Sequence, residues 1–191
     1  MQPPIELPRP KLEFVATSLE GCFEIRPTVI EDERGFFAKI FHKPLWEEHG
    51  LCTEFQEEYL TYSVRRTIRG LHFQLPPMQH AKVVFCAKGE VFDVAVDLRK
   101  GSPTYGEHAV IHLSGAASNA VYLAPGFAHG FCVTSDEALL YYKQSSVYSP
   151  THDAGIRWDS ANIPWPISDP ILSQRDRLLQ PLSFFESPFK L

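Results

Sequence analysis

The sequence lacks several features that would assign it to a common class of protein. Its 191 residues contain no apolar run close to the roughly 20 residues that a transmembrane helix needs. Its first residues form neither the basic nor the apolar region of a secretory signal peptide, so we expect no such leader. The sequence signatures of dinucleotide sites, P-loops, serine hydrolases and zinc metalloproteases are missing. We therefore expect no membrane partner and an activity outside those enzyme classes.

Cysteine pairs and net positive charge are also scarce. The four cysteines, Cys22, Cys52, Cys86 and Cys132, lie far apart and form no C-x-x-C pair. This spacing argues against a zinc cluster or a thioredoxin-type motif, and predicts reduced, mostly buried thiols in a cytoplasmic protein. The 18 basic and 23 acidic residues give a net charge of −5. Nucleic-acid binding through overall charge is therefore not expected.

The sequence does contain short apolar segments that are separated by many proline and glycine residues, which are typical of turns. Sixteen prolines and 11 glycines favour strands and turns over long helices. In the strand expected at 91–98, Phe92 and Val94 share one face and Asp93 and Asp97 the other. Other strands are expected at 83–86, 108–113, 120–123, 130–134 and 138–144, and short helices near 44–49 and 173–179. This pattern predicts an all-β sandwich, jelly roll or barrel, as one domain over 1–191 with proline-rich extensions at about 1–12 and 180–191.

Two histidine-containing segments could face one cavity in such a fold. They are R-G-L-H-F-Q at 69–74 and P-G-F-A-H-G at 125–130. Alternation places His72 and Gln74 on one face and Arg69 on the other, unless a local bend turns Arg69. His72 and His129 could be metal ligands with His80, His108 or His112, an acid/base site, or structural histidines.

Other residues could complete an acid/base site. Tyr142 lies on one face of the strand at 138–144, where a neutral phenol can donate a proton or simply pack. Asp159 and Asp176 are both candidates to orient a histidine ring, and sequence spacing does not choose between them. Glu57 and Glu58 are expected in a solvated acidic run, and D-E-R-G at 32–35 in a turn between strands.

Six motifs, taken together and in order, resemble the dTDP-4-dehydrorhamnose 3,5-epimerase family. They are the segments 69–74, 88–99, 101–104, 125–131, 155–159 and 171–176, and the similarity runs from about Gly21 to Asp176. The resemblance implies a cupin-type double-stranded β-helix, or jelly roll, with short peripheral helices. It also implies a homodimer, no metal or organic cofactor, and a nucleotide-linked 4-keto-6-deoxyhexose inverted at C3, C5 or both.

The resemblance further implies a role for each matching residue. His72 would be the base, Asp176 its orienting partner, and Tyr142 the opposing acid. Lys82 would lie near the C4 oxygen, where a cation stabilises an enolate. The implied substrate contacts are Arg34, Phe37, Lys39, Glu57, Tyr59, Arg69, Gln74, His129, Tyr148, Asp153 and Arg175. Among these, Arg34 and Phe37 would reach the nucleotide from the neighbouring subunit, and Tyr148 would stack on the base.

The chain departs from the family pattern at several binding positions. Lys39 stands where a glutamate is common, Glu57-Glu58-Tyr59 replaces Gln-Asp-Asn, and Arg175 replaces a lysine. The alternatives are therefore a 3-epimerase, or an epimerase of a GDP- or CDP-linked keto-sugar, including a heptose. Other hypotheses are a 3,4-ketoisomerase, a metal-dependent dioxygenase and a non-catalytic sugar-nucleotide-binding protein.

Overall fold

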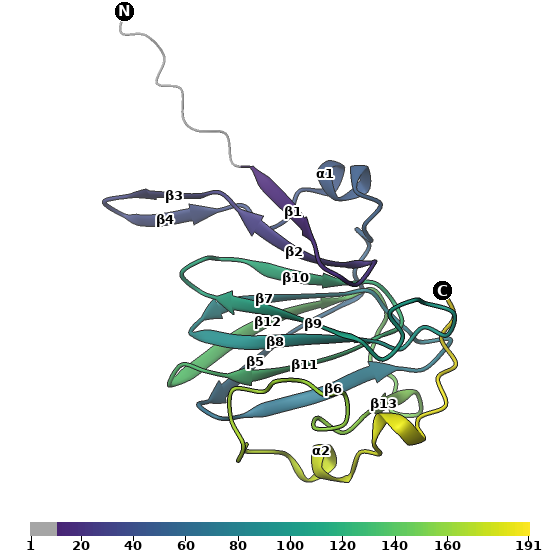
Figure 1. Cartoon of the computed structure of the whole chain (residues 1–191). Coiled ribbons are helices and arrows are strands. Elements are labelled where there is room, and N and C mark those ends of the chain that lie inside the picture. Colours follow the sequence, from purple (N-terminus) through teal and green to yellow (C-terminus); the bar gives the residue numbers. More distant parts are fainter. Residues whose placement is uncertain (1–10) are drawn as a thin grey trace, which may run out of the picture.

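Two antiparallel β-sheets pack face to face in the computed structural model, which describes residues 11–191 (Figure 1). The six-stranded sheet has the order β1 (Leu12–Ala16), β2 (Cys22–Pro27), β10 (Ala120–Leu123), β7 (Lys82–Lys88), β12 (Glu137–Gln144) and β5 (Glu57–Val64). The five-stranded sheet has the order β13 (Asp153–Gly155), β6 (Ile68–Gln74), β11 (Phe127–Val133), β8 (Glu90–Asp97) and β9 (His108–Ser114). The predicted all-β architecture is confirmed.

The turns and caps that the sequence marks end these elements as expected. Helix α1 (Lys43–Glu48) has proline in its first turn, and α2 (Gln174–Leu178) begins at an N-cap serine. Gly89 adopts a φ of +80° between β7 and β8, and a Cβ there would lie 2.0 Å from the Glu137 carbonyl oxygen. Only glycine fits this turn, which carries the chain from the six-stranded sheet to the five-stranded sheet. Strand β5 was not expected, because polar side chains interrupt its apolar pattern.

The core continues on both sides of the five-stranded sheet. Between the sheets, Val84, Leu140 and Phe131 belong to one buried apolar cluster. On the outer face, residues near the C-terminus cover a second cluster that contains Leu71 and Val96. Because both faces of β8 are covered, Asp93 and Asp97 are fully buried despite their charge. Asp97 is neutralised by Arg99, whose Nη2 lies 2.8 Å from its Oδ2.

The C-terminal extension packs on its own chain. It contains a 3₁₀ turn, η1 (Leu182–Phe184), and Phe189 is buried with its carbonyl oxygen accepting from Lys100 N at 2.9 Å. The proline-rich segment expected at the other end lies mostly outside the described residues. All four cysteines are free, and three of them are buried, as expected.

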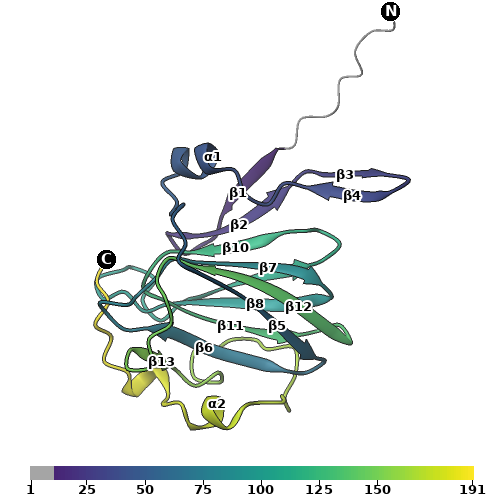
Figure 2. The same ribbon diagram turned by 180° about the vertical axis from the view of Figure 1, so that it is seen from behind.

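A two-stranded hairpin projects from this body beside β2 (Figures 1 and 2). It consists of β3 (Val29–Asp32) and β4 (Gly35–Ala38), joined at the turn expected from D-E-R-G. Phe36 and Phe37 are exposed on it, whereas Trp46 is buried in a cluster outside the six-stranded sheet that Phe41 packs against. Trp46 and Phe41 therefore belong to the core, whereas Phe36 and Phe37 do not.

Candidate active site

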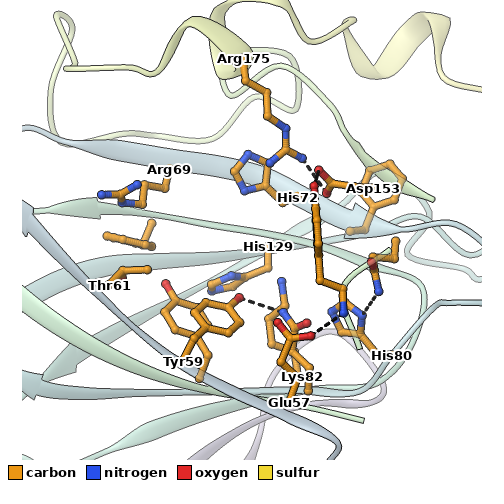
Figure 3. A pocket seen from close by; sticks show the side chains of 16 residues that line it. Glu57, Tyr59, Thr61, Arg69, His72, His80, Lys82, His129, Asp153 and Arg175 are labelled. Atoms are coloured by element: carbon orange, nitrogen blue, oxygen red, sulfur yellow. Dashed lines mark hydrogen bonds and ion pairs between the residues drawn. The ribbon is translucent and has the colours of Figure 1, made fainter. Parts of the chain in front are cut away.

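A cavity of about 310 Å³ lies among residues of the two sheets (Figure 3). It brings together eleven residues to which the family resemblance assigns a role: Glu57, Tyr59, Arg69, His72, Gln74, Lys82, His129, Tyr142, Tyr148, Asp153 and Arg175. Thr61, Phe73, His80, Phe131 and Gln144 complete the lining. The residues come from both sheets and from the loops beside them, so a bound molecule would be contacted from opposite sides.

His72 on β6 is held by a buried carboxylate. Its Nε2 lies 2.6 Å from Oδ1 of Asp176, which is 2% exposed. Ser173 caps α2 by accepting from Asp176 N at 3.0 Å, so the helix start fixes the carboxylate. Asp159 instead binds Arg157 Nε at 2.5 Å, which decides between the two candidate aspartates.

The environment of His72 favours a neutral ring that can act as a base. Burial lowers the pKa of His72 from its usual 6.5, and the opposing attraction of Asp176 only partly offsets this. The same contact lowers the pKa of Asp176, although burial alone would raise it. We assign the proton to Nε2, where it is donated to the carboxylate, which leaves the Nδ1 lone pair free.

A β-bulge turns Arg69 onto the cavity side, against the prediction from alternation. In the pairing of β11 with β6, His129 faces His72 but Phe131 faces Arg69, so β6 contains one extra residue. Gly70 occupies the bulge with a φ of +125°, and a Cβ there would come within 2.7 Å of Gly130 Cα. Arg69 Nε then donates to Ser63 Oγ at 2.9 Å at the cavity wall. The bend that would be needed for Arg69 to reach the pocket is therefore present.

Lys82 places a buried ammonium in the cavity (Figure 3). The residue is 6% exposed, and no ion pair of its Nζ is found within residues 11–191. Burial lowers the pKa of Lys82 to about 8, although the carboxylates of Asp93 and Asp153 favour its charged form. An ammonium with no fixed partner can stabilise negative charge that develops on a bound molecule.

Tyr142 on β12 faces the same cavity from the six-stranded sheet. It is buried, and desolvation raises its pKa well above 10, so the phenol keeps its proton at neutral pH. Its ring stacks on Tyr59 with centroids 4.6 Å apart and lies edge-on to His129 at 6.3 Å. The cavity thus has a basic imidazole on one sheet and a neutral phenol on the other.

A second histidine–aspartate pair lies deeper in the cavity. His129 Nε2 is 2.8 Å from Oδ2 of Asp93, and both residues are almost completely buried. The other carboxylate oxygen of Asp93 is buried without a partner among the described residues. Sequence reasoning did not select Asp93, although a charged residue within the apolar strand at 91–98 was the available signal.

Charged groups also line the cavity beside Tyr148. Arg175 Nη2 pairs with Oδ1 of Asp153 at 2.8 Å, and the Tyr148 backbone N–H donates to the Glu57 carboxylate. Gln74 is held by its Oε1, which accepts from Ser149 N at 2.6 Å. Glu57 therefore belongs to the site, which corrects its assignment to a solvated run, whereas Glu58 pairs with Lys143 on the other face.

Comparison with known proteins identifies the family. The family model described as dTDP-4-dehydrorhamnose 3,5-epimerase matches residues 16–183. A dTDP-4-dehydrorhamnose 3,5-epimerase of Methanothermobacter thermautotrophicus is 43% identical over 90% of this chain and 95% of that protein. The chain belongs to the dTDP-4-dehydrorhamnose 3,5-epimerase family. It is accordingly an isomerase of the sugar-nucleotide epimerase type, as expected from its motifs.

Other members of the epimerase family support the fold and show how activity varies. The crystal structure of the Legionella pneumophila enzyme with dTDP-4-keto-L-rhamnose has a TM-score of 0.89 and 33% identity, covering 95% of this chain and 99% of that one. The jelly-roll prediction is thereby confirmed. A dTDP-4-dehydrorhamnose 3-epimerase of Streptomyces niveus is 42% identical over 83% of this chain and 78% of that protein. Overall identity therefore does not separate the two activities.

Besides Asp176, which contacts His72 from outside the cavity, three residues that the epimerase family resemblance selects do not line the cavity. Arg34 lies in the turn of the β3–β4 hairpin and pairs with Asp32, with 85% of its side chain exposed. Phe37 lies on β4 and is also exposed, and Lys39 follows that strand. Within one chain these residues make no part of the cavity wall.

The structure also bears on metal and membrane binding. Within residues 11–191, no group of three or more His, Cys, Asp or Glu residues is placed to hold a metal ion. His80 lines the cavity, but His108 and His112 lie on β9 and do not. No helix in the described part of the chain is long and apolar enough to cross a membrane.

Proposed function

We propose that this epimerase inverts C3 and C5 of a dTDP-linked 4-keto-6-deoxyhexose, with His72 as base and Tyr142 as acid. One observation carries the proposal: the imidazole and the phenol face a shared cavity from opposite sheets, beside a buried ammonium. A carbon held between them can lose a proton from one face and gain one on the other. That sequence of transfers inverts its configuration.

The proposed reaction balances protons without a cofactor. The C4 ketone acidifies the hydrogens on C3 and C5. Nδ1 of His72 takes one of them, and the electron pair of the C–H bond becomes the enolate, with its charge on the C4 oxygen. The Lys82 ammonium stabilises that charge. The Tyr142 hydroxyl then gives its proton to the opposite face of the carbon, and solvent later restores both residues to their starting protonation states.

The other end of the cavity suits the nucleotide diphosphate. Arg69 and Arg175 offer planar guanidinium groups that match phosphate oxygens, and His129 offers a ring nitrogen beside the sugar. Tyr148 is half exposed at the cavity wall, where its ring can stack on a base. Gln74 and Asp153 complete the contacts. The cytoplasmic location expected from the sequence stays a prediction.

Deuterium uptake tests the proposed function directly. The protein is incubated in D₂O with 4-keto-6-deoxyhexoses linked to dTDP, GDP or CDP, and C3 and C5 are followed by NMR. We expect uptake at both carbons, fastest with the dTDP sugar. Uptake at C3 alone would show a 3-epimerase. This is the second candidate function, because the Streptomyces niveus relative is a dTDP-4-dehydrorhamnose 3-epimerase. No uptake with any sugar would overturn the proposal.

We further propose a homodimer in which the β3–β4 hairpin of one protomer completes the site of its partner. Arg34 and Phe37 are exposed on a hairpin that projects from the body (Figure 2). Both phenylalanines of the hairpin are exposed, and Arg34 does not reach the cavity of its own chain. A nucleotide site shared between two protomers requires such side chains. Lys39 would approach the same nucleotide from the base of the hairpin.

Mixing two inactive variants tests the shared site. Arg34→Ala and His72→Ala are each expected to be nearly inactive, because each removes one part of every site. After unfolding and refolding together in equal amounts, half of the sites in mixed dimers would contain both residues. Activity should then recover to about a quarter of the wild-type value. No recovery, with dimers confirmed by light scattering, would show that Arg34 acts within its own chain or not at all.

A further inference from the structure

Tyr59 occupies a position that the acid/base assignment does not use. It lies on β5, directly opposite Tyr142 on β12, and both side chains line the cavity. The two rings are nearly parallel, at 11°, with centroids 4.6 Å apart. Gln144 Nε2 donates to the Tyr59 hydroxyl at 2.8 Å, and Gln144 is itself buried. The Tyr59 ring is therefore fixed at both its face and its hydroxyl (Figure 3).

The position of β5 at the edge of the sheet determines what the Tyr59 ring shields. β5 is the terminal strand of the six-stranded sheet, so no further strand of that sheet lies beyond it. On the other side of β12, Tyr142 has β7 as neighbour, and His129 approaches from the opposite sheet. The ring of Tyr59 is thus what separates Tyr142 from the open edge of the sheet.

We propose that Tyr59 is a positioning residue that shields the Tyr142 phenol from water and holds it in line with the substrate; this inference rests on the proposed function. A phenol packed between rings has few rotamers and a fixed direction for its proton. The burial that raises the pKa of Tyr142 depends on the same neighbours. Tyr59 therefore acts through Tyr142 and transfers no proton itself.

The shield should control what happens to the enolate after it forms. With Tyr142 in place, its O–H bond breaks as the new C–H bond forms on the face opposite His72, and the sugar is inverted. If Tyr142 is displaced, the protonated His72 exchanges its proton with solvent and then returns a solvent-derived proton to the original face of the enolate. The substrate then exchanges hydrogen with solvent but keeps its configuration. The ratio of inversion to exchange without inversion reports this choice, and both outcomes start from the same bound enolate.

Tyr59→Leu tests the inference. In D₂O, we measure by NMR the inverted product and the deuterated but uninverted substrate at C3 and C5. We expect the inversion-to-exchange ratio to fall about ten-fold, the factor that loss of a favourable aromatic pair produces in an equilibrium. Tyr142→Phe gives the ratio for complete loss of the acid. Tyr59→Thr, a residue suited to strands, provides a second variant that also removes the ring.

Two controls separate the ring from other effects. Tyr59→Phe keeps the ring and loses only the hydrogen bond from Gln144, so its ratio should stay close to that of the wild type. Tyr62→Leu makes the same change on the outward face of β5, where Tyr62 is exposed, and should leave the ratio unchanged. A wild-type ratio in Tyr59→Leu or Tyr59→Thr would overturn the inference while leaving the epimerase intact. Absence of exchange in the wild-type protein would overturn the proposed function as well.

Discussion

Replacing His72 with asparagine is expected to lower turnover about 10³-fold, within the range that a general base contributes. Asparagine has no basic nitrogen, so neither C3 nor C5 should exchange with D₂O. The shorter amide does not reach the place of His72 Nε2, which lies 2.6 Å from Asp176 Oδ1 in the wild type, but Asp176 Oδ2 still accepts from Gly70 N at 3.5 Å. The buried carboxylate therefore keeps a partner, and the fold should persist.

The measurement is the exchange rate at both carbons, together with the midpoint of thermal unfolding. His49→Asn makes the same change at the end of α1, where the ring stacks on Phe14 away from the cavity, and should exchange at the wild-type rate. Exchange near the wild-type rate in His72→Asn would show that another group removes the proton. Loss of exchange with a large loss of stability would require Asp176→Asn as a separate test of the pair.

Local signals in the sequence were sufficient for much of the fold. Alternation and turn residues placed β10 at its observed bounds, the proline in its first turn placed α1, and a short helix was expected near α2. The ends of these elements are marked by residues within them or directly beside them. β5 depends instead on what its partners bury, because its inward side chains include Glu57 and Thr61, which line a cavity rather than a core.

The site was predictable only where position follows from alternation or from family resemblance. Periodicity put Arg69 on the wrong face, because one extra residue in β6 is set by pairing with β11 and not by local pattern. Asp93 could not be matched to His129 without knowing that β8 and β11 are neighbours. Spacing did not choose between Asp176 and Asp159; the family resemblance selected Asp176, and its contact with His72 joins segments about a hundred residues apart.

The proposed contribution of a second protomer to the site could be derived neither from the sequence nor from the structure of one chain. The sequence predicts a turn between strands at this hairpin, and the structure shows that the hairpin projects from the body. It carries an exposed arginine and two exposed phenylalanines. Neither view places the hairpin at a cavity, and the shared site proposed for it requires a second copy of the chain. The mixing experiment with Arg34→Ala is therefore the step that connects the hairpin to the cavity.

Lys82→Met should change activity and stability in opposite directions. Loss of the ammonium removes the charge that stabilises the enolate, so kcat should fall about 10²-fold to 10³-fold. The methionine keeps an apolar stem in the same space, and the folded protein no longer bears the cost of a buried cation. Because the pKa of Lys82 falls from 10.5 to about 8, that cost amounts to about 3 kcal/mol at most at neutral pH, a net figure that already includes the attraction of Asp93 and Asp153. Urea unfolding should therefore give an equal or higher midpoint.

The lowered pKa of Lys82 predicts the alkaline side of the pH profile of kcat/KM. The reaction needs neutral His72 and charged Lys82, so kcat/KM should fall as pH drops below the lowered pKa of His72 and again as pH rises through about 8. In Lys82→Met the residual kcat/KM should lose the alkaline fall and keep the acid one. Stability has its own dependence: the folded state binds fewer protons than the unfolded state between pH 8 and 10.5, so this group makes wild-type stability rise across that interval. An unchanged alkaline limb in Lys82→Met would show that another group, and not this ammonium, meets the enolate oxygen.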